Sequence, residues 1–137
     1  MSITWDDKLK TGIPTIDEQH QFIVEALSKI RISKLKKVEL FQLLSDLQTY
    51  LPSHFDLEEK YMIDTNYPEY ASHKADHDKV SEDTKNILTQ NKPDANPSKI
   101  AVEVVKYMQN WFLDHYTNVD VIMADYLKQH LVEIKKP

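Results

Sequence analysis

Apolar residues recur along most of the chain at the three- and four-residue spacing that places them on one face of an α-helix. Short polar segments, several of them with proline, interrupt the pattern. It predicts a helix that begins near residue 15, with its end and a short turn in the basic segment 34–37. Helices at 38–63, 68–88, 97–115 and, shorter, 119–127 are expected to follow. Residues 1–14 lack a clear period and are expected to form an arm.

These elements predict an all-α fold. Helices joined by short connections pack as antiparallel neighbours, so we expect an antiparallel up-down-up-down four-helix bundle with an N-terminal arm and a short C-terminal fifth helix. A single glycine among 137 residues argues against a sheet protein with many tight turns. The length and the 41% of hydrophobic residues suit one domain over residues 1–137.

Two local signals refine the helices. Thr15 and Glu18 have the spacing of a capping box, in which both side chains satisfy free amides at the start of the first helix. Pro52 lies inside the second helical pattern and has no amide hydrogen to donate to the carbonyl of Gln48, so a kink is expected there.

Composition excludes several classes of function. The formal net charge of −5 argues against nucleic acid as a partner. The absence of cysteine removes disulfides, thiolate metal sites and cysteine nucleophiles, and it suits a cytoplasmic protein. No apolar run approaches the roughly 18–20 residues of a membrane helix, and the first ten residues do not resemble a signal peptide, so no membrane partner is expected.

The residues with distinctive chemistry lie within the apolar faces. His54 and Glu58, four residues apart, continue the leucine stripe of the second helix without a break. Five of the six histidines fall on inward faces, at least one on each long helix: His20, His54, His73, His77 and His115. Because alternate helices of the bundle reverse direction, all five are expected at one end. His130 is expected on the surface.

A metal centre accounts best for this cluster. Buried imidazoles and carboxylates are costly unless they are hydrogen-bonded or bind a metal. Five imidazoles exceed the needs of one tetrahedral zinc ion, so two six-coordinate ions fit better. Glu58 is the first bridging carboxylate, and Asp120, at or beyond the end of the fourth helix, is the best second. The residue types alone leave iron, zinc, copper and nickel open.

The full pattern resembles the hemerythrin family, in particular its bacterial single-domain members. The ligand pattern is His20, His54-x3-Glu58, His73-x3-His77 and His115-x4-Asp120. Further matching residues are Trp5, Gly12-Ile13, Ile16-Asp17-x-Gln19-His20, Phe55, Glu59, Met62, Tyr67-Pro68, Lys74 and Trp111-Phe112. The likeness covers nearly the whole chain and fills all seven ligand positions.

The resemblance implies a non-haem centre of two iron ions with an oxo or hydroxo bridge and with O2 as its ligand. His73, His77 and His115 would bind one iron. His20 and His54 would bind the other, and Glu58 and Asp120 would bridge the two. The iron with two histidines would keep one position open for O2. A dry pocket around it would be walled by Ile23, Phe55, Trp111 and Phe112, which are equally expected as ordinary core.

Reversible binding of O2 for carriage, storage or delivery is the predicted function, without enzymatic activity. Two alternatives are a sensor of O2, NO or redox state that acts through a separate partner, and an iron-dependent oxidase. Two departures from the family pattern bear on O2 access: Tyr116 stands where isoleucine is common, and Pro52 closely precedes His54. A monomer is favoured, and Glu59 is expected to be solvated.

Overall fold

The computed structural model describes residues 5–32, 37–89 and 97–130. Within these ranges the elements are all helical: the 3-10 helix η1 (Asp7–Leu9), α1 (Pro14–Ile32), α2 (Lys37–Asp64), α3 (Tyr70–Thr89), α4 (Pro97–His115), the π-helical segment η2 (Tyr116–Asp120) and α5 (Val121–His130). The all-α prediction is confirmed, and each predicted helix is present within a few residues of its expected bounds.

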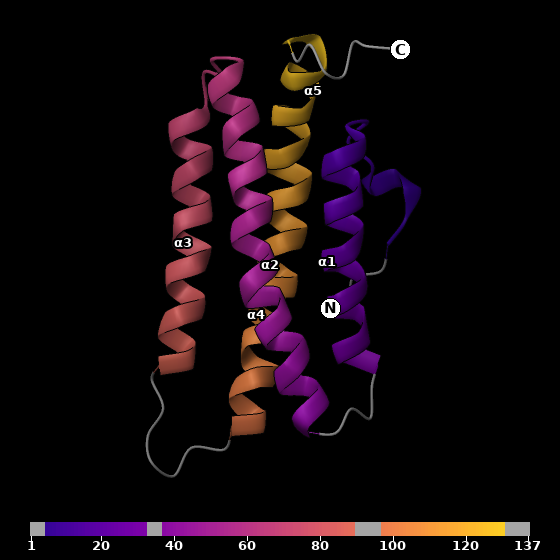
Figure 1. Ribbon diagram of the computed structural model, residues 1–137, viewed down its shortest axis with the longest axis vertical. Helices are drawn as coiled ribbons and strands as arrows, with labels where there is room; N and C mark the ends of the chain where they lie inside the picture. The colour runs from indigo at the N-terminus through magenta and orange to yellow at the C-terminus, as the bar shows by residue number, and fades with distance from the viewer. Residues whose placement is uncertain (1–4, 33–36, 90–96, 131–137) are drawn as a thin grey trace.

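The four long helices run alternately up and down (Figure 1). α1 and α3 each pack against both α2 and α4, which is the arrangement of a four-helix bundle. α5 continues upward from α4 and packs against α2, while the N-terminal arm with η1 lies beside α1. The predicted antiparallel up-down-up-down bundle with a fifth helix is therefore confirmed.

Buried apolar side chains form two clusters at different heights in the bundle. One cluster includes Ile23, Leu27, Leu47, Met108 and Phe112. The other includes Ile13, Ile16, Met62, Met123 and Leu127. Along α1, His20 lies between Ile16 of one cluster and Ile23 of the other. On α2, His54 and Glu58 lie between Leu47 and Met62 in the same way. The inward-facing polar residues are therefore enclosed by apolar core on both sides.

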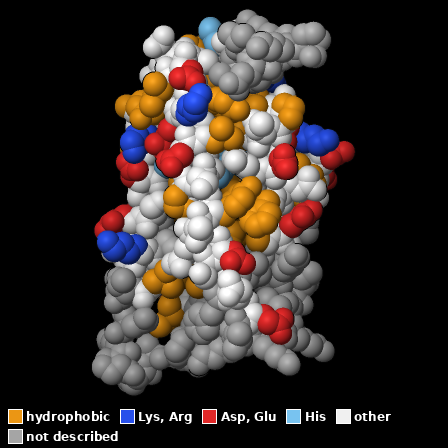
Figure 2. All heavy atoms as spheres, viewed as in Figure 1, with side chains coloured by type: hydrophobic (Ala, Val, Ile, Leu, Met, Phe, Trp, Pro, Cys, Tyr) orange, Lys and Arg blue, Asp and Glu red, His pale blue; other side chains and the backbone are white. Residues whose placement is uncertain are grey.

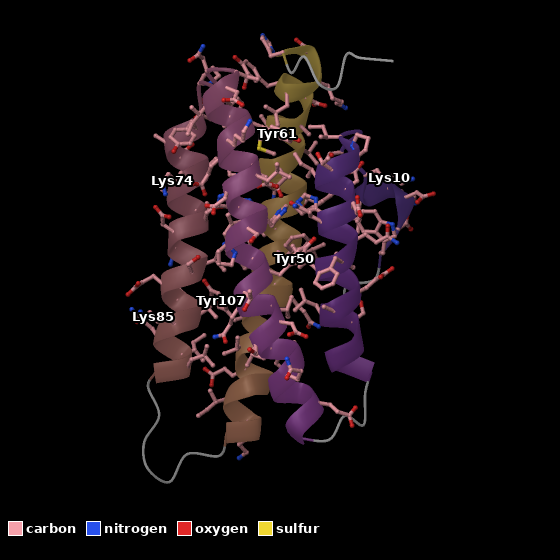
Figure 3. All side chains as sticks on the ribbon, viewed as in Figure 1. Lys10, Tyr50, Tyr61, Lys74, Lys85 and Tyr107 are labelled. Carbon is pink, nitrogen blue, oxygen red and sulfur yellow. The ribbon has the colours of Figure 1, made fainter. Side chains whose placement is uncertain are left out.

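The outer faces of the helices carry charges of both signs. Figure 2 shows lysine, aspartate and glutamate side chains interspersed with small apolar patches on one face. Lys74 and Lys85 lie on the outer side of α3 (Figure 3), and the Lys74 ammonium is 3.1 Å from the Asp78 carboxylate one turn further on. No helix in the described ranges is long and apolar enough to cross a membrane.

The start of α1 differs from the prediction. The helix begins at Pro14, and the carbonyl of Ile13 accepts its first amide hydrogen bond, so Ile13 is the capping residue. The expected capping box at Thr15 and Glu18 is wrong. The Thr15 hydroxyl instead lies 3.0 Å from the Tyr61 hydroxyl on α2.

Asp17 organises the arm that leads into α1. Its carboxylate accepts hydrogen bonds from the Thr11 amide at 2.6 Å, the Thr11 hydroxyl at 2.7 Å and the Gly12 amide at 3.1 Å. Gly12 has a φ of 90°, a left-handed conformation that glycine adopts without strain. This loop holds the arm against the end of the bundle where α1 starts.

Candidate metal centre

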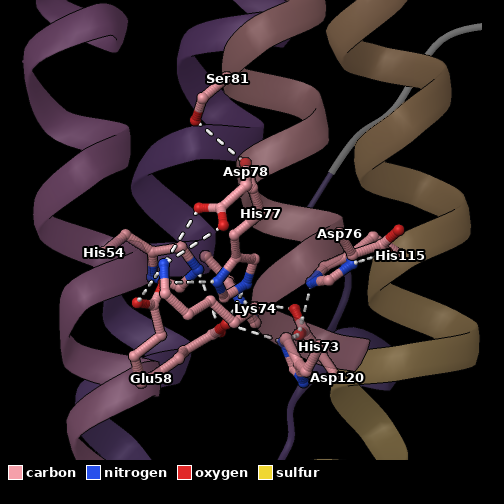
Figure 4. Close-up of polar contacts among 12 residues, drawn as sticks. His54, Glu58, His73, Lys74, Asp76, His77, Asp78, Ser81, His115 and Asp120 are labelled. Atoms are coloured by element: carbon pink, nitrogen blue, oxygen red, sulfur yellow. Dashed lines mark hydrogen bonds and ion pairs between the residues drawn. The ribbon is translucent and has the colours of Figure 1, made fainter. Parts of the chain in front are cut away.

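Seven buried polar residues converge between the two apolar clusters. Figure 4 shows His54, Glu58, His73, His77, His115 and Asp120 among them. The seven residues are His20 from α1, His54 and Glu58 from α2, His73 and His77 from α3, His115 from α4 and Asp120 from η2. None of them exposes more than 2% of its surface. The structure thus brings together all the residues that the sequence pattern singled out as metal ligands.

Helical spacing places four of these side chains in pairs. On α2, Nε2 of His54 lies 3.1 Å from Oε2 of Glu58. On α3, the ring centroids of His73 and His77 are 4.6 Å apart. Each pair is four residues apart, a spacing that stacks two side chains on one face of an α-helix.

His115 and Asp120 also lie side by side on one face, although they are five residues apart and not four. Residues five apart on an α-helix point about 140° away from each other. The π-helical turn of η2 takes up the extra residue, and the Val121 amide donates to the carbonyl of Tyr116, five residues earlier. Nε2 of His115 consequently lies 2.9 Å from Oδ1 of Asp120. Asp120 lies beyond the end of α4, but within a continuous helical stretch.

The two oxygens of Glu58 face different histidines. Oε2 lies 3.2 Å from Nε2 of His20 and 3.1 Å from Nε2 of His54. Oε1 lies 3.1 Å from Nε2 of His77 and 3.4 Å from Nε2 of His73. Glu58 therefore stands between a pair of histidines from α1 and α2 and a pair from α3.

Asp120 divides its oxygens in the same way. Oδ2 lies 3.2 Å from Nε2 of His20. Oδ1 lies 3.1 Å from Nε2 of His73 and 2.9 Å from Nε2 of His115. Both carboxylates thus present one oxygen to the His20 side and the other to the His73 side, which is the geometry of a carboxylate that bridges two cations.

The donor atoms fall into two sets that share these carboxylates. One set holds Glu58, Asp120, His73, His77 and His115, and the other holds Glu58, Asp120, His20 and His54. Within each set the donor atoms lie within 4.8 Å of one another. The arrangement can hold two cations, one with three imidazoles and one with two.

The protein leaves many of these atoms without hydrogen bonds. Nε2 of His73, His77 and His115 and both oxygens of Asp120 are buried and form no hydrogen bond of regular geometry with other protein groups. A buried polar atom without a hydrogen bond costs about 1–3 kcal/mol, and a bound cation would remove that cost. Neutral imidazoles and carboxylates are ligands that iron accepts, and the donor set therefore fits a pair of iron ions.

Three of the histidines also hydrogen-bond through the nitrogen that faces away from the carboxylates. Nδ1 of His54 donates to the Gln19 side-chain oxygen at 2.8 Å. Nδ1 of His77 donates to Glu59 at 3.0 Å, and Nδ1 of His115 donates to Asp76 at 2.7 Å. These bonds leave the lone pair of Nε2 in each ring available to bind a metal ion, and they fix the orientation of the ring.

Sequence reasoning missed these three acceptors. Glu59 was expected to be solvated, which is wrong: its side chain is only 15% exposed and holds His77. Each acceptor lies on a different helix from the histidine that it holds, so no spacing along the chain connects them. Only a chemical argument could have predicted these acceptors, because a histidine that binds metal usually donates its other ring hydrogen to an acceptor.

The carboxylates are held in their ionised form. Burial alone would raise the pKa of Glu58, but the charge of His54 and contacts with other imidazoles hold it well below its usual range. Burial and the charge of Glu58 would raise the pKa of Asp120, but its contacts with the imidazoles of His115, His20 and His73 lower it. Burial alone would lower the pKa of His20 and His73, but the two carboxylates raise both to about 9. Cations must therefore displace protons from these imidazoles when they bind.

A small apolar cavity adjoins the cluster. It has a volume of about 10 Å³, which suits one molecule the size of water. All four residues that the sequence pattern proposed as a pocket wall line it: Ile23, Phe55, Trp111 and Phe112. The Phe55 ring stacks on His77 with centroids 4.1 Å apart, and the Phe112 ring lies 5.4 Å from that of His20.

Tyr116 packs beside His20, with ring centroids 4.7 Å apart. Its buried hydroxyl has no hydrogen-bond partner among the described residues. Burial, together with the charges of Asp17 and Asp120, raises the pKa of Tyr116, so the hydroxyl stays neutral. His130, by contrast, is exposed at the end of α5, as expected.

Comparison with known proteins connects this geometry with a family. The model of the "Hemerythrin HHE cation binding domain" matches residues 11–127. The bacteriohemerythrin of Stenotrophomonas maltophilia is 28% identical over 131 residues, covering 94% of this chain and 84% of the relative. That of Pseudomonas aeruginosa is 29% identical over 140 residues, covering 98% and 87%.

A solved structure of a mutant protein shares the fold. It superposes on this chain with a TM-score of 0.73 at 25% identity, and the match covers 91% of this chain and 96% of the other. The family model extends over the whole ligand set, from His20 to Asp120. On these grounds, the chain belongs to the hemerythrin family.

Proposed function

We propose that this chain is a non-haem diiron protein that binds O2 reversibly for carriage, storage or delivery. Membership of the hemerythrin family supports a non-haem iron protein that binds O2. The observation that carries the finer proposal is the division of each carboxylate between two groups of histidines. One oxygen of Glu58 and one of Asp120 face His20, while the other two face His73.

The two ligand sets would give the two iron ions different numbers of imidazoles. His73, His77 and His115 would hold one iron, and His20 and His54 the other, with both carboxylates shared. The side with two imidazoles has one donor fewer and is the side that would accept an external ligand. Two ferrous ions bound here would supply the two electrons that O2 takes up on binding and returns on release.

The residues around the ligands favour reversible binding. The apolar cavity beside the cluster excludes charged molecules and bulk water, because its walls offer no hydrogen bonds to replace those lost on entering. Gln19, Glu59 and Asp76 hold the imidazoles in place, so the ligand set needs little rearrangement when O2 binds or leaves.

We assign binding rather than catalysis to this site. A cavity of about 10 Å³ has room for a molecule close to water in size and none for an organic substrate. An oxidase acting on a small molecule would need a larger chamber next to the iron that keeps an open position.

Reconstitution with ferrous iron under anaerobic conditions tests the proposal. We expect about two iron ions per chain, in keeping with a shared carboxylate site. A visible absorption band should appear on exposure to air and disappear under vacuum over repeated cycles. Irreversible bleaching with release of peroxide would show an oxidase or a sensor instead, and one iron per chain would refute the two-cation assignment.

A further inference from the structure

A larger pocket opens at the surface beside the inner cavity. It has a volume of about 360 Å³ and lies among residues of α2 and α3, with Met108 of α4 at its base. Gln48, Pro52 and Ser81 are exposed at its mouth, and Thr84 is 9% exposed inside it. We call this the outer pocket, and the cavity beside the metal ligands the inner cavity.

Four residues line both spaces: Leu51, Phe55, Val80 and Met108. Phe55, Val80 and Met108 are each at most 4% exposed, and Leu51 is half-buried. These side chains form a single layer, with the outer pocket on one side and the inner cavity on the other. All four are apolar, and leucine and methionine change rotamer without breaking a hydrogen bond.

The inner face of this layer reaches the metal ligands directly. Phe55 stacks on His77 with ring centroids 4.1 Å apart and lies 5.7 Å from the ring of His54. Trp111, across the inner cavity, stacks on His115 at 4.3 Å. A molecule that passes the shared layer therefore arrives against the imidazoles without crossing another helix.

Pro52 lies where α2 lines the outer pocket. It has no amide hydrogen for the carbonyl of Gln48, one turn earlier, and both residues line the outer pocket. This turn of α2 is therefore held less tightly than a regular helical turn, at the place where the pocket meets the surface.

We propose that the outer pocket is the access route for small neutral gas molecules to the metal centre, with Leu51, Phe55, Val80 and Met108 as its gate. The proposal rests on the proposed function for the identity of the gas as O2. Hydrated anions are disfavoured on this route, because they would lose water of hydration against an apolar layer. The route does not depend on the metal ligands themselves.

Thr84→Phe tests the route. The new ring would fill the outer pocket without touching the inner cavity, which Thr84 does not line. By stopped-flow spectroscopy of the iron-loaded protein, we expect the association and dissociation rate constants of O2 both to fall about tenfold, with a nearly unchanged Kd, because a gate slows passage in both directions. An association rate within about twofold of the unmodified protein would overturn the proposal.

Val102→Phe is the matched control. Val102 lines a different surface pocket, on α4, with Lys99, Glu103 and Lys106, none of which lines the inner cavity. Val102→Phe should leave both rate constants unchanged, and an equal slowing by Val102→Phe and Thr84→Phe would overturn the proposal.

Ser81→Phe, at the exposed mouth, repeats the test without altering a buried position. Val80→Ala, which thins the gate, should accelerate both rates.

Xenon under pressure probes the route without iron. In crystals of the metal-free protein we expect xenon in the outer pocket and the inner cavity, and in Thr84→Phe crystals the outer xenon should be lost. An outer pocket that takes up no xenon would overturn the route. Because xenon needs no metal, this result separates a failed route from a failed assignment of O2 binding.

Discussion

His115 illustrates how single residues prepare the centre. Its Nε2 lies 2.9 Å from Asp120, while its Nδ1 donates to Asp76 at 2.7 Å. The bond to Asp76 selects the tautomer in which Nε2 carries the free lone pair, and it makes that nitrogen a stronger donor. Trp111 stacks on the same ring and limits its rotation. The histidine is therefore oriented before any metal arrives.

Asp76→Ala should weaken iron binding about 10–100-fold, the range found when such an outer acceptor is removed. The fold should survive, because the Asp76 side chain is 39% exposed. Competition with a chelator, followed by absorbance, measures the loss. Asp78→Ala is the control, since Asp78 lies on the same helix and contacts Lys74 rather than a histidine. Equal iron affinity in the two variants would contradict the role given to Asp76.

Two helices depart from regular geometry next to the centre, and each departure has a local cause. The π-turn between α4 and α5 turns Asp120 toward His115. In α2, Pro52 interrupts the backbone hydrogen bonding two residues before His54, yet the helix continues to Asp64. Regular helices would be more stable, so these irregularities accompany function at a cost in stability.

Pro52→Ala should raise the free energy of unfolding of the metal-free protein by about 1–3 kcal/mol, because alanine restores the amide bond to Gln48 and favours helix. Urea denaturation followed by circular dichroism measures the change. Ser53→Ala, at the next exposed position of α2, should change stability by less than about 0.5 kcal/mol. No gain from Pro52→Ala would mean that the local structure already compensates for the missing bond.

At the scale of the molecule, the bundle encloses a cluster of positively charged imidazoles and negatively charged carboxylates in its interior. The centre lies between the two apolar clusters, where water cannot screen its charges. In the metal-free protein, protonated imidazoles balance the ionised carboxylates of Glu58 and Asp120. Cations take over that balance when they bind, so metal content and proton content determine stability together.

The melting temperature of the metal-free protein should therefore fall as pH rises from 6.5 to 9. His20 and His73 have pKa values raised from 6.5 to about 9 in the fold, so their stabilisation is complete below pH 6.5 and is lost through pH 9. The lowered pKa values of Glu58 and Asp120 work oppositely, with stabilisation lost at acidic pH.

Iron-loaded protein should show no such fall, because its imidazoles are bound in neutral form at every pH in this range. Differential scanning calorimetry at matched ionic strength compares the two forms. Parallel profiles with and without iron would contradict this account of the cluster.

Much of the architecture followed from local patterns. The three- and four-residue periodicity predicted the helices, and the short connections predicted antiparallel packing, because both depend on neighbours along the chain. The inward histidines and Glu58 were recognisable because they stand in otherwise apolar stripes. The capping box failed since Pro14 starts α1 one residue earlier and leaves Ile13 as the cap.

By itself, the sequence determined the bundle and the residue types that gather at one depth in it. It placed that depth at one end of the bundle, whereas the structure places it between two apolar clusters. Only the tertiary structure decided which oxygen of Glu58 and of Asp120 faces which histidine, that Glu59 and Asp76 hold imidazoles, and that two cavities share one apolar layer. These features join residues from different helices. Their geometry depends on how whole helices are placed and rotated against each other, and no spacing along one chain specifies that.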